Sequence, residues 1–121
     1  MKVPTQHPQE IEVWYILPAI RRELVLALKE KGKAQKDIAV LLNITEAAIS
    51  QYTKEKRGTE ITFPPEIREF IGQAAAEITD PATAYHQIQR ISEHLKHSKA
   101  ICKLHAQIEG DLKGCDVCYK K

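Results

Sequence analysis

Four residues near the end of the sequence have the types and the spacing of a metal site. Cys102 and His105 are three positions apart, and after nine further residues Cys115 and Cys118 form a second close pair. Together they use all three cysteines of the chain. Three thiolates and one imidazole suit tetrahedral zinc, with Zn–S distances of about 2.3 Å and a Zn–N distance of about 2.0 Å. The sequence therefore predicts a metal-bound segment at residues 99–121.

The identity of the metal stays open at this point. An iron–sulfur cluster can also take three thiolates and one histidine, and it would make the protein sensitive to redox state or iron. Free cysteines without metal are a third reading. The helix-borne pair comes before the Cys-x-x-Cys pair, which reverses the common zinc-finger order. Zinc is the first expectation and iron–sulfur the alternative, whereas His86, His94 and His97 are expected to be surface residues rather than ligands.

The bulk properties set limits on the rest of the chain. With 121 residues it has room for one compact domain, or for a small domain with an appendage. A formal charge of +2 permits nucleic-acid binding without requiring it. No secretory leader is evident, so we expect a cytoplasmic protein, where a cysteine cluster favours metal over disulfides. The apolar run at residues 13–17 is too short to cross a bilayer, and no membrane association is expected.

Apolar residues recur at helical spacing along most of the chain, and no segment shows the alternation of a strand. Helix boundaries are marked by Gly32, by Pro64 and Pro65, and by the pair Asp80 and Pro81. The pattern predicts an all-α bundle of about five to six helices with a C-terminal Cys3His knuckle. The expected helices are residues 10–31 with a kink or restart at Pro18, 34–42, 45–54, one beginning at Glu66, 81–97 and 99–109.

Residues 35–54 predict two short helices that cross at a steep angle. Ala39 is small enough to stand where the two helices approach each other. Asn43 tolerates the left-handed backbone that a tight turn requires, and Thr45 is a good N-cap for the second helix. The apolar positions expected to face inward are Ile38, Leu42, Ile44, Ile49 and Tyr52.

This stretch resembles the Cro/repressor-type (Xre-like) helix-turn-helix of transcription regulators. The matching positions are Gln35, Ile38, Ala39, Leu42, Ile44, Thr45, Ile49, Ser50 and Tyr52. The sequence departs from the family pattern at Ala34, where a hydroxyl cap is usual, and at Asn43, where Gly is more common. The whole chain, with V-W-Y-I-L-P-A-I-R-R-E-L at residues 13–24 and a Cys-rich end, also resembles a group of predicted archaeal transcription regulators.

The resemblance implies that the second helix lies in the DNA major groove, with its first residues on base edges. By position, the reading face is Thr45, Glu46, Ala47, Ser50, Gln51 and Lys54. Gln51 is expected to pair with an adenine edge and Ala47 to meet a thymine methyl, whereas Glu46 would need a cytosine amine. Contacts to the phosphate backbone are expected from Gln35, Lys36, Lys54, Lys56 and Arg57. Residues 29–57 hold seven Lys or Arg against four Asp or Glu, so positive charge is concentrated there.

These observations predict a sequence-specific, double-stranded DNA-binding regulator that acts as a homodimer and carries a structural or sensory metal. Its expected parts are a flexible arm at 1–9, the helix-turn-helix domain at 10–60, a helical region at 61–98 that is the candidate for dimerisation, and the metal tail at 99–121. No nucleophile with a base, phosphate loop or open metal position is evident, so neither enzyme activity nor a small-molecule substrate is expected. A protein–protein adaptor without DNA binding is the alternative.

Overall fold

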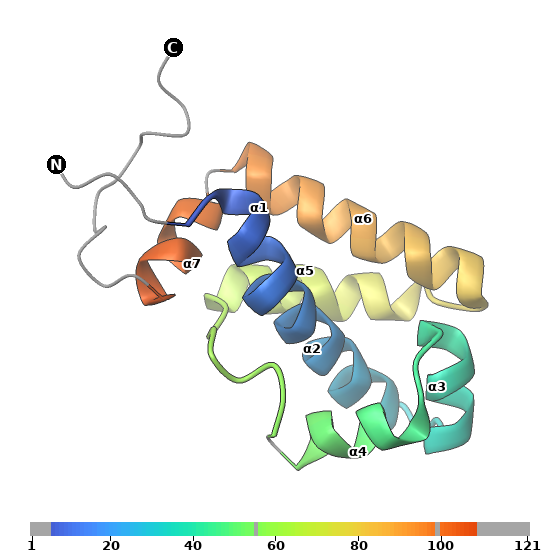
Figure 1. The fold of residues 1–121 in the computed structure, drawn as a ribbon. Coiled ribbons are helices and arrows are strands. Elements are labelled where there is room, and N and C mark those ends of the chain that lie inside the picture. Colours follow the sequence, from blue (N-terminus) through green and yellow to red (C-terminus); the bar gives the residue numbers. More distant parts are fainter. Residues whose placement is uncertain (1–5, 55, 99, 109–121) are drawn as a thin grey trace, which may run out of the picture.

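The computed structural model describes residues 6–54, 56–98 and 100–108, and every regular element among them is a helix. The predicted all-α class is therefore confirmed. The elements are α1 (Pro8–Ile11), the π-helical turn η1 (Glu12–Ile16), α2 (Leu17–Glu30), α3 (Gln35–Leu42), α4 (Glu46–Thr53), α5 (Pro65–Ala76), α6 (Pro81–His97) and α7 (Ala100–Ile108). In Figure 1, α3 and α4 lie at one end of the molecule and α1 and α7 at the other. The predicted knuckle includes Cys115 and Cys118, which lie outside the described residues.

The first long helix contains a π turn just before its proline. Residues at both junctions, from Ile11 to Leu17, keep helical backbone angles, so α1, η1 and α2 follow one another without a break. The Leu17 N–H donates to the carbonyl of Glu12, five residues back. Pro18 has no N–H to donate, and a wider turn accommodates a proline inside a helix. The predicted interruption at Pro18 thus takes the form of a π turn.

Helix α1 also begins inside the segment that the sequence predicted to be an arm. Pro8 and Gln9 are helical, and the His7 N–H donates to the Glu10 carboxylate at 2.8 Å. The first N–H groups of a helix have no acceptor within the helix. A proline at the first helical position therefore loses no hydrogen bond, which makes it a good helix start. The helix therefore begins at Pro8, within the predicted arm of residues 1–9. Residues 1–5 of the predicted arm lie outside the described part.

The ends of the later helices follow the sequence signals closely. Helix α6 has the predicted bounds, and its N-cap Asp80 accepts a hydrogen bond from the Thr83 N–H at 2.7 Å. That bond is the main reason why the pKa of the Asp80 carboxyl lies below its usual value. Ala34 and Thr45 stand as caps just outside α3 and α4 rather than inside them. A capping residue belongs to the turn by its backbone angles, which accounts for the difference of one residue.

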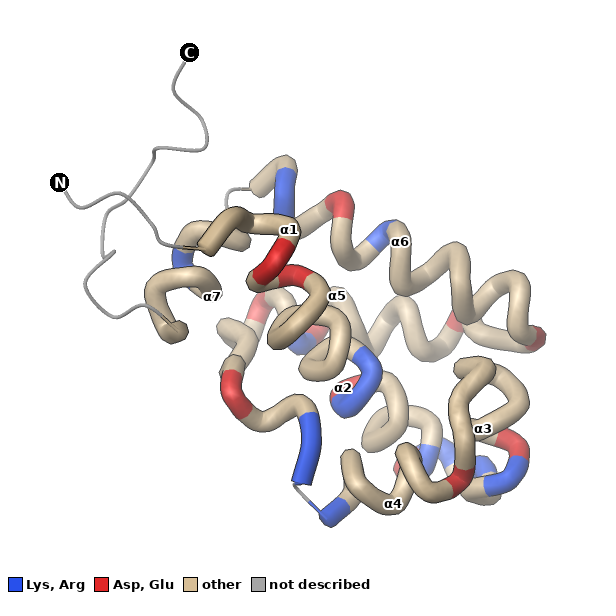
Figure 2. Tube along the Cα trace, in the orientation of Figure 1, with Lys and Arg blue, Asp and Glu red and all other residues tan. Residues whose placement is uncertain are grey.

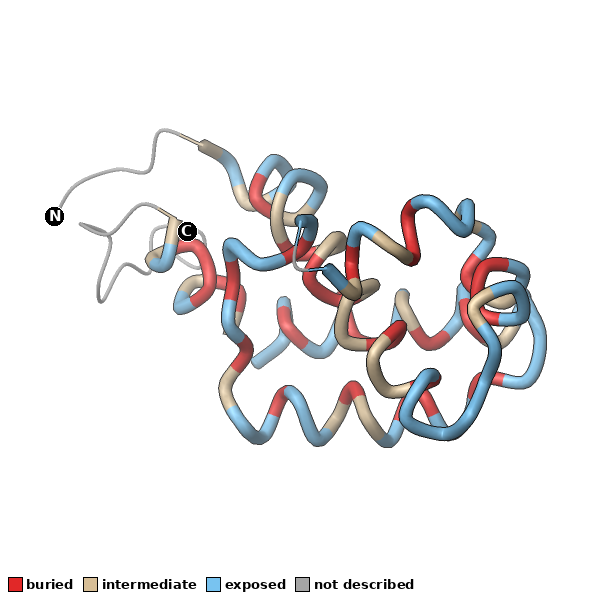
Figure 3. The backbone as a smooth tube through the Cα atoms, turned by 90° about the horizontal axis from the view of Figure 1, so that it is seen from below, coloured by how far each residue is buried: buried red, intermediate tan, exposed pale blue. Residues whose placement is uncertain are grey.

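Helix α2 lies at the centre of the core. Ile20, Leu24 and Leu28 are fully buried on it, and α2 contacts α3, α4, α5 and α6. Figure 3 shows that buried positions recur on each helix while the positions between them face outward. The apolar stripes of α5 and α6 belong to the same cluster, so they are used within the chain. A dimer formed by the predicted region 61–98 would have to use the outward faces of these helices.

The connector between α4 and α5 is held against α2 and α7. Gly58 has a φ of +75°, and a Cβ at this position would lie 2.6 Å from the carbonyl oxygen of Pro18. Further along, the Gln107 side chain accepts from the N–H of Thr62 and donates to its carbonyl, both at 2.8 Å. These contacts fix the path by which the chain leaves α4. None of the helices within 6–54, 56–98 and 100–108 is long and apolar enough to cross a membrane.

The contact at Gly58 predicts a large loss of stability for Gly58→Ala. An alanine would have both an unfavourable φ and a clash with backbone atoms that cannot rotate away, so we expect the free energy of unfolding to fall by roughly 3 kcal/mol. Gly32→Ala is the matched control, because Gly32 has a φ of +88° with nothing within 4 Å of its Cβ position. It should lose only about 1 kcal/mol. Equal losses in urea denaturation would contradict the close approach.

Candidate nucleic-acid interface

The turn between α3 and α4 has the conformation that the sequence predicts. Asn43 adopts the left-handed region, with φ 55° and ψ 46°, and is the only non-glycine residue with positive φ in the described ranges. The Ile44 N–H then donates to the Ala39 carbonyl at 3.0 Å. Thr45 caps α4, and its hydroxyl accepts from the Ala48 N–H at 3.0 Å. The end of α3 and the start of α4 are thus both satisfied by local hydrogen bonds.

The inward faces of the two helices are packed into the common core. Ala39 is 8% exposed, and its small side chain is buried between neighbouring helices as predicted. Helix α4 packs against both α2 and α3. Ile44 is half-buried and packs against the core from the turn. The remaining buried positions of the pair are Ile38, Leu42, Ala48, Ile49 and Tyr52.

A side-chain bridge also joins the two helices. The Gln35 Nε2 donates to the Glu46 carbonyl and to the Ser50 hydroxyl, each at 2.9 Å. Ser50 was expected on the exposed reading face, but it is half-buried beneath this bridge. Gln35 was expected to contact phosphate, whereas its amide nitrogen is engaged within the chain. Both residues therefore set the position of α4 relative to α3.

The other residues of the predicted reading face are exposed together. Ala47, Gln51 and Lys54 follow one another at spacings of four and three, so they lie along one side of α4. Thr45 and Glu46 are exposed at the beginning of the same helix. The outward face of α4 is thus short and mostly uncharged, with a carboxylate at its start and a lysine at its end.

Basic residues flank the helix pair on both sides. One group precedes and opens α3 and includes Lys36, and the other follows α4 with Lys54, Lys56 and Arg57, all exposed. Figure 2 shows these two groups at the ends of the pair, with acidic residues between them. The Arg57 guanidinium lies over the Tyr52 ring, 5.7 Å from its centroid, which ties the segment after α4 back to that helix.

Comparison with protein-family models, with curated proteins and with solved structures gives no match.

The predicted metal ligands are only partly within the described residues. Cys102 is half-buried and His105 is buried, one turn apart on α7, beside the core residues Ile101 and Leu104. Within the described part of the chain, no three His, Cys, Asp or Glu side chains are grouped closely enough to hold a metal ion. The other two predicted ligands lie beyond residue 108.

The other histidines of α6 are on the surface, as expected. His86, His94 and His97 are all exposed. The His94 ring stacks on Phe70 of α5 with 4.2 Å between centroids, so this exposed side chain helps to hold α5 against α6.

The sequence did not reveal two of the roles seen here. The bridge from Gln35 spans 15 positions to Ser50, and no local pattern signals such a bond. The contact of Gly58 with Pro18 spans 40 positions, although an isolated glycine in a polar segment was a visible hint. Gln35 contacts α4 directly, and Gly58 lies close to α2 in the segment that follows α4.

The bridge predicts that Gln35→Ala loosens α4. Loss of two hydrogen bonds should lower the free energy of unfolding by about 1–2 kcal/mol and speed hydrogen exchange of the α4 amides. Lys36→Ala is the control, since Lys36 is exposed on the adjacent position of α3. It should change stability by less than about 0.5 kcal/mol. If exchange in α4 is the same in both variants, the bridge does not position the helix.

Proposed function

We propose that this protein is a sequence-specific regulator of transcription that binds double-stranded DNA with α4 in the major groove. One observation carries the proposal: a capped helix, set by a left-handed Asn43 turn and bridged to its neighbour by Gln35, leaves a side of small and polar residues exposed. A helix of about this width fits the major groove of B-DNA. Its inward side is buried, so only the outward side is available for recognition.

Base recognition is assigned to residues at the beginning and middle of α4. The amide of Gln51 offers a donor and an acceptor that match the N7 and N6 positions of adenine. The Ala47 methyl suits contact with a thymine methyl, and Glu46 would accept from a cytosine amine. Thr45 stays at the entrance of the groove, where its hydroxyl is already used as the cap.

Phosphate contacts are assigned to the basic groups at the two ends of the helix pair. Lys36 is exposed beside the beginning of α3, and Lys54, Lys56 and Arg57 are exposed at and after the end of α4. Basic side chains on both sides of a groove-bound helix contact phosphates and fix the register of the helix on the DNA, but they do not distinguish between bases. Such contacts also make affinity fall steeply as salt rises.

Two copies are needed to read a full site in this proposal. One α4 contacts only a half-site, and a symmetric dimer places two such helices about 34 Å apart, one turn of DNA. We therefore propose a homodimer. The outward faces of α5 and α6 are candidates for its interface, because their inward faces are filled by the core.

We also propose that Cys102, His105, Cys115 and Cys118 bind zinc, with an iron–sulfur cluster as the alternative. Cys102 and His105 are one turn apart on α7, so a thiolate and an imidazole are available from neighbouring positions on one helix. A metal at this place would fasten the last part of the chain to α7, and α7 is itself packed on α1 and α6. Its role would be structural unless its loss changes DNA binding.

Direct reading by Gln51 predicts a specific change in Gln51→Ala. After selection of preferred duplexes from a random pool, the variant should bind them with about 1–3 kcal/mol less affinity and lose preference at one base position in each half-site. Gln9→Ala is the matched control, since Gln9 is an exposed glutamine on α1, outside the helix pair and outside the faces proposed for the dimer. It should bind like the wild type. An unchanged base preference in Gln51→Ala would rule out direct reading by this residue.

The metal proposal predicts one zinc per chain in protein purified without oxygen, with no sulfide and no visible absorption. Substituting Cys118→Ser should reduce zinc content because one of four ligands is lost. Metal and sulfide analysis with visible spectroscopy gives the readout. Iron with sulfide and a brown colour would instead support the cluster, and protein free of any metal would contradict both.

A further inference from the structure

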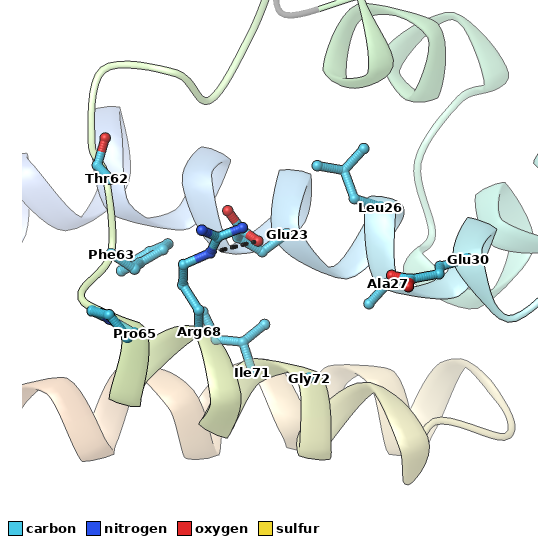
Figure 4. Close-up of a pocket in the computed structure, with 10 residues that line it drawn as sticks. All are labelled: Glu23, Leu26, Ala27, Glu30, Thr62, Phe63, Pro65, Arg68, Ile71 and Gly72. Atoms are coloured by element: carbon cyan, nitrogen blue, oxygen red, sulfur yellow. Dashed lines mark ion pairs between the residues drawn. The ribbon is translucent and has the colours of Figure 1, made fainter.

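A hollow of about 750 Å³ lies on the side of α2 that faces α5. Figure 4 shows α2 above it, α5 below it and the connector at residues 59–64 closing one end. The volume is within the range of small-molecule sites, roughly 300–1,000 Å³. The apolar side chains that line it are Leu26, Ala27, Phe63, Pro65 and Ile71.

Gly72 lines this hollow and has no steric reason to be glycine. It lies inside α5, where glycine is less stable than alanine. A Cβ built at Gly72 would meet nothing within 4 Å, and its φ is not in the left-handed region. The packing of the described chain therefore does not require glycine there. Because Gly72 has no side chain, nothing projects from this position into the hollow.

The charges around the hollow favour a cation. Glu23 and Glu30 lie seven residues apart on α2, which corresponds to a rise of about 10 Å. The Glu23 carboxylate is 3.8 Å from the Arg68 Nε, and Figure 4 marks this ion pair across the hollow. Glu30 has no ion pair among the described residues. The Glu23 carboxylate is thus paired with Arg68 at one end of the hollow, whereas Glu30 at the other end is an exposed residue.

We infer that this hollow binds a small organic cation, a primary amine carried on an apolar body. The ammonium group would pair with Glu30, and the body would lie over Ala27, Ile71 and Gly72. Burial of the body supplies the attraction, and the carboxylate selects against anions of the same shape. The site is separate from the exposed face of α4, so the inference stands whether or not the chain binds DNA.

The test is a titration of the full-length, ¹⁵N-labelled protein with n-hexylamine, followed by backbone amide shifts. We expect saturable shifts at millimolar concentration that are confined to α2, α5 and residues 59–65. Hexanoate has the same apolar chain with the opposite charge, and it should bind several-fold more weakly. Glu30→Gln should weaken binding of the amine about threefold, as expected for an ion pair with an exposed carboxylate.

Gly72 provides the second arm of the test. Gly72→Leu should fill the hollow and abolish binding, whereas Gly72→Ala should raise the melting temperature and keep binding within about twofold. If Gly72→Leu does not fold, Glu30→Gln with the hexanoate comparison decides alone. The proposal fails if n-hexylamine gives no saturable shifts, if hexanoate binds equally well, or if Gly72→Leu is folded and still binds. It also fails if the same amides shift with protein concentration alone, since a second copy would then occupy the hollow.

Discussion

Burial of α2 is the constraint on which the rest of the structure depends. Ile20, Leu24 and Leu28 have no exposed surface, and α3, α4, α5 and α6 all contact this helix. Each fully buried Leu or Ile contributes about 1.5–3 kcal/mol relative to exposure, so these positions supply a large part of the folding free energy. Because α4 and α5 both pack on α2, the exposed face of α4 and the hollow beside Gly72 share one support.

Helix α4 is held from several directions, and this matters for any recognition role. Its apolar side is in the core, Gln35 bridges to it from α3, and the Arg57 guanidinium stacks on Tyr52 behind it. Gly58 then fixes the connector against Pro18. A recognition helix supported in this way loses little freedom on binding, because its orientation is set before the partner arrives.

Features that depend on a few neighbouring residues were predictable from the sequence. The left-handed Asn43, the Thr45 cap and the start of α6 at Asp80 follow from local backbone chemistry, and the structure confirms them. The bridge from Gln35 to Ser50 and the approach of Gly58 to Pro18 join segments distant in sequence, so local patterns did not reveal them. The π turn before Pro18 was predictable only in part, because the proline indicates an interruption of the helix without specifying its form. The openness at Gly72 depends on the distance between α2 and α5, which no local pattern contains.

We propose that the outward side of α4 is the surface that meets DNA. The decisive measurement is to add a selected DNA duplex to the ¹⁵N-labelled protein and to map the amide shifts. We expect the largest shifts at residues 45–54, smaller ones at Lys36, Lys56 and Arg57, and almost none along the middle of α5. Shifts confined to α5 and α6, or no shifts at low salt, would contradict it.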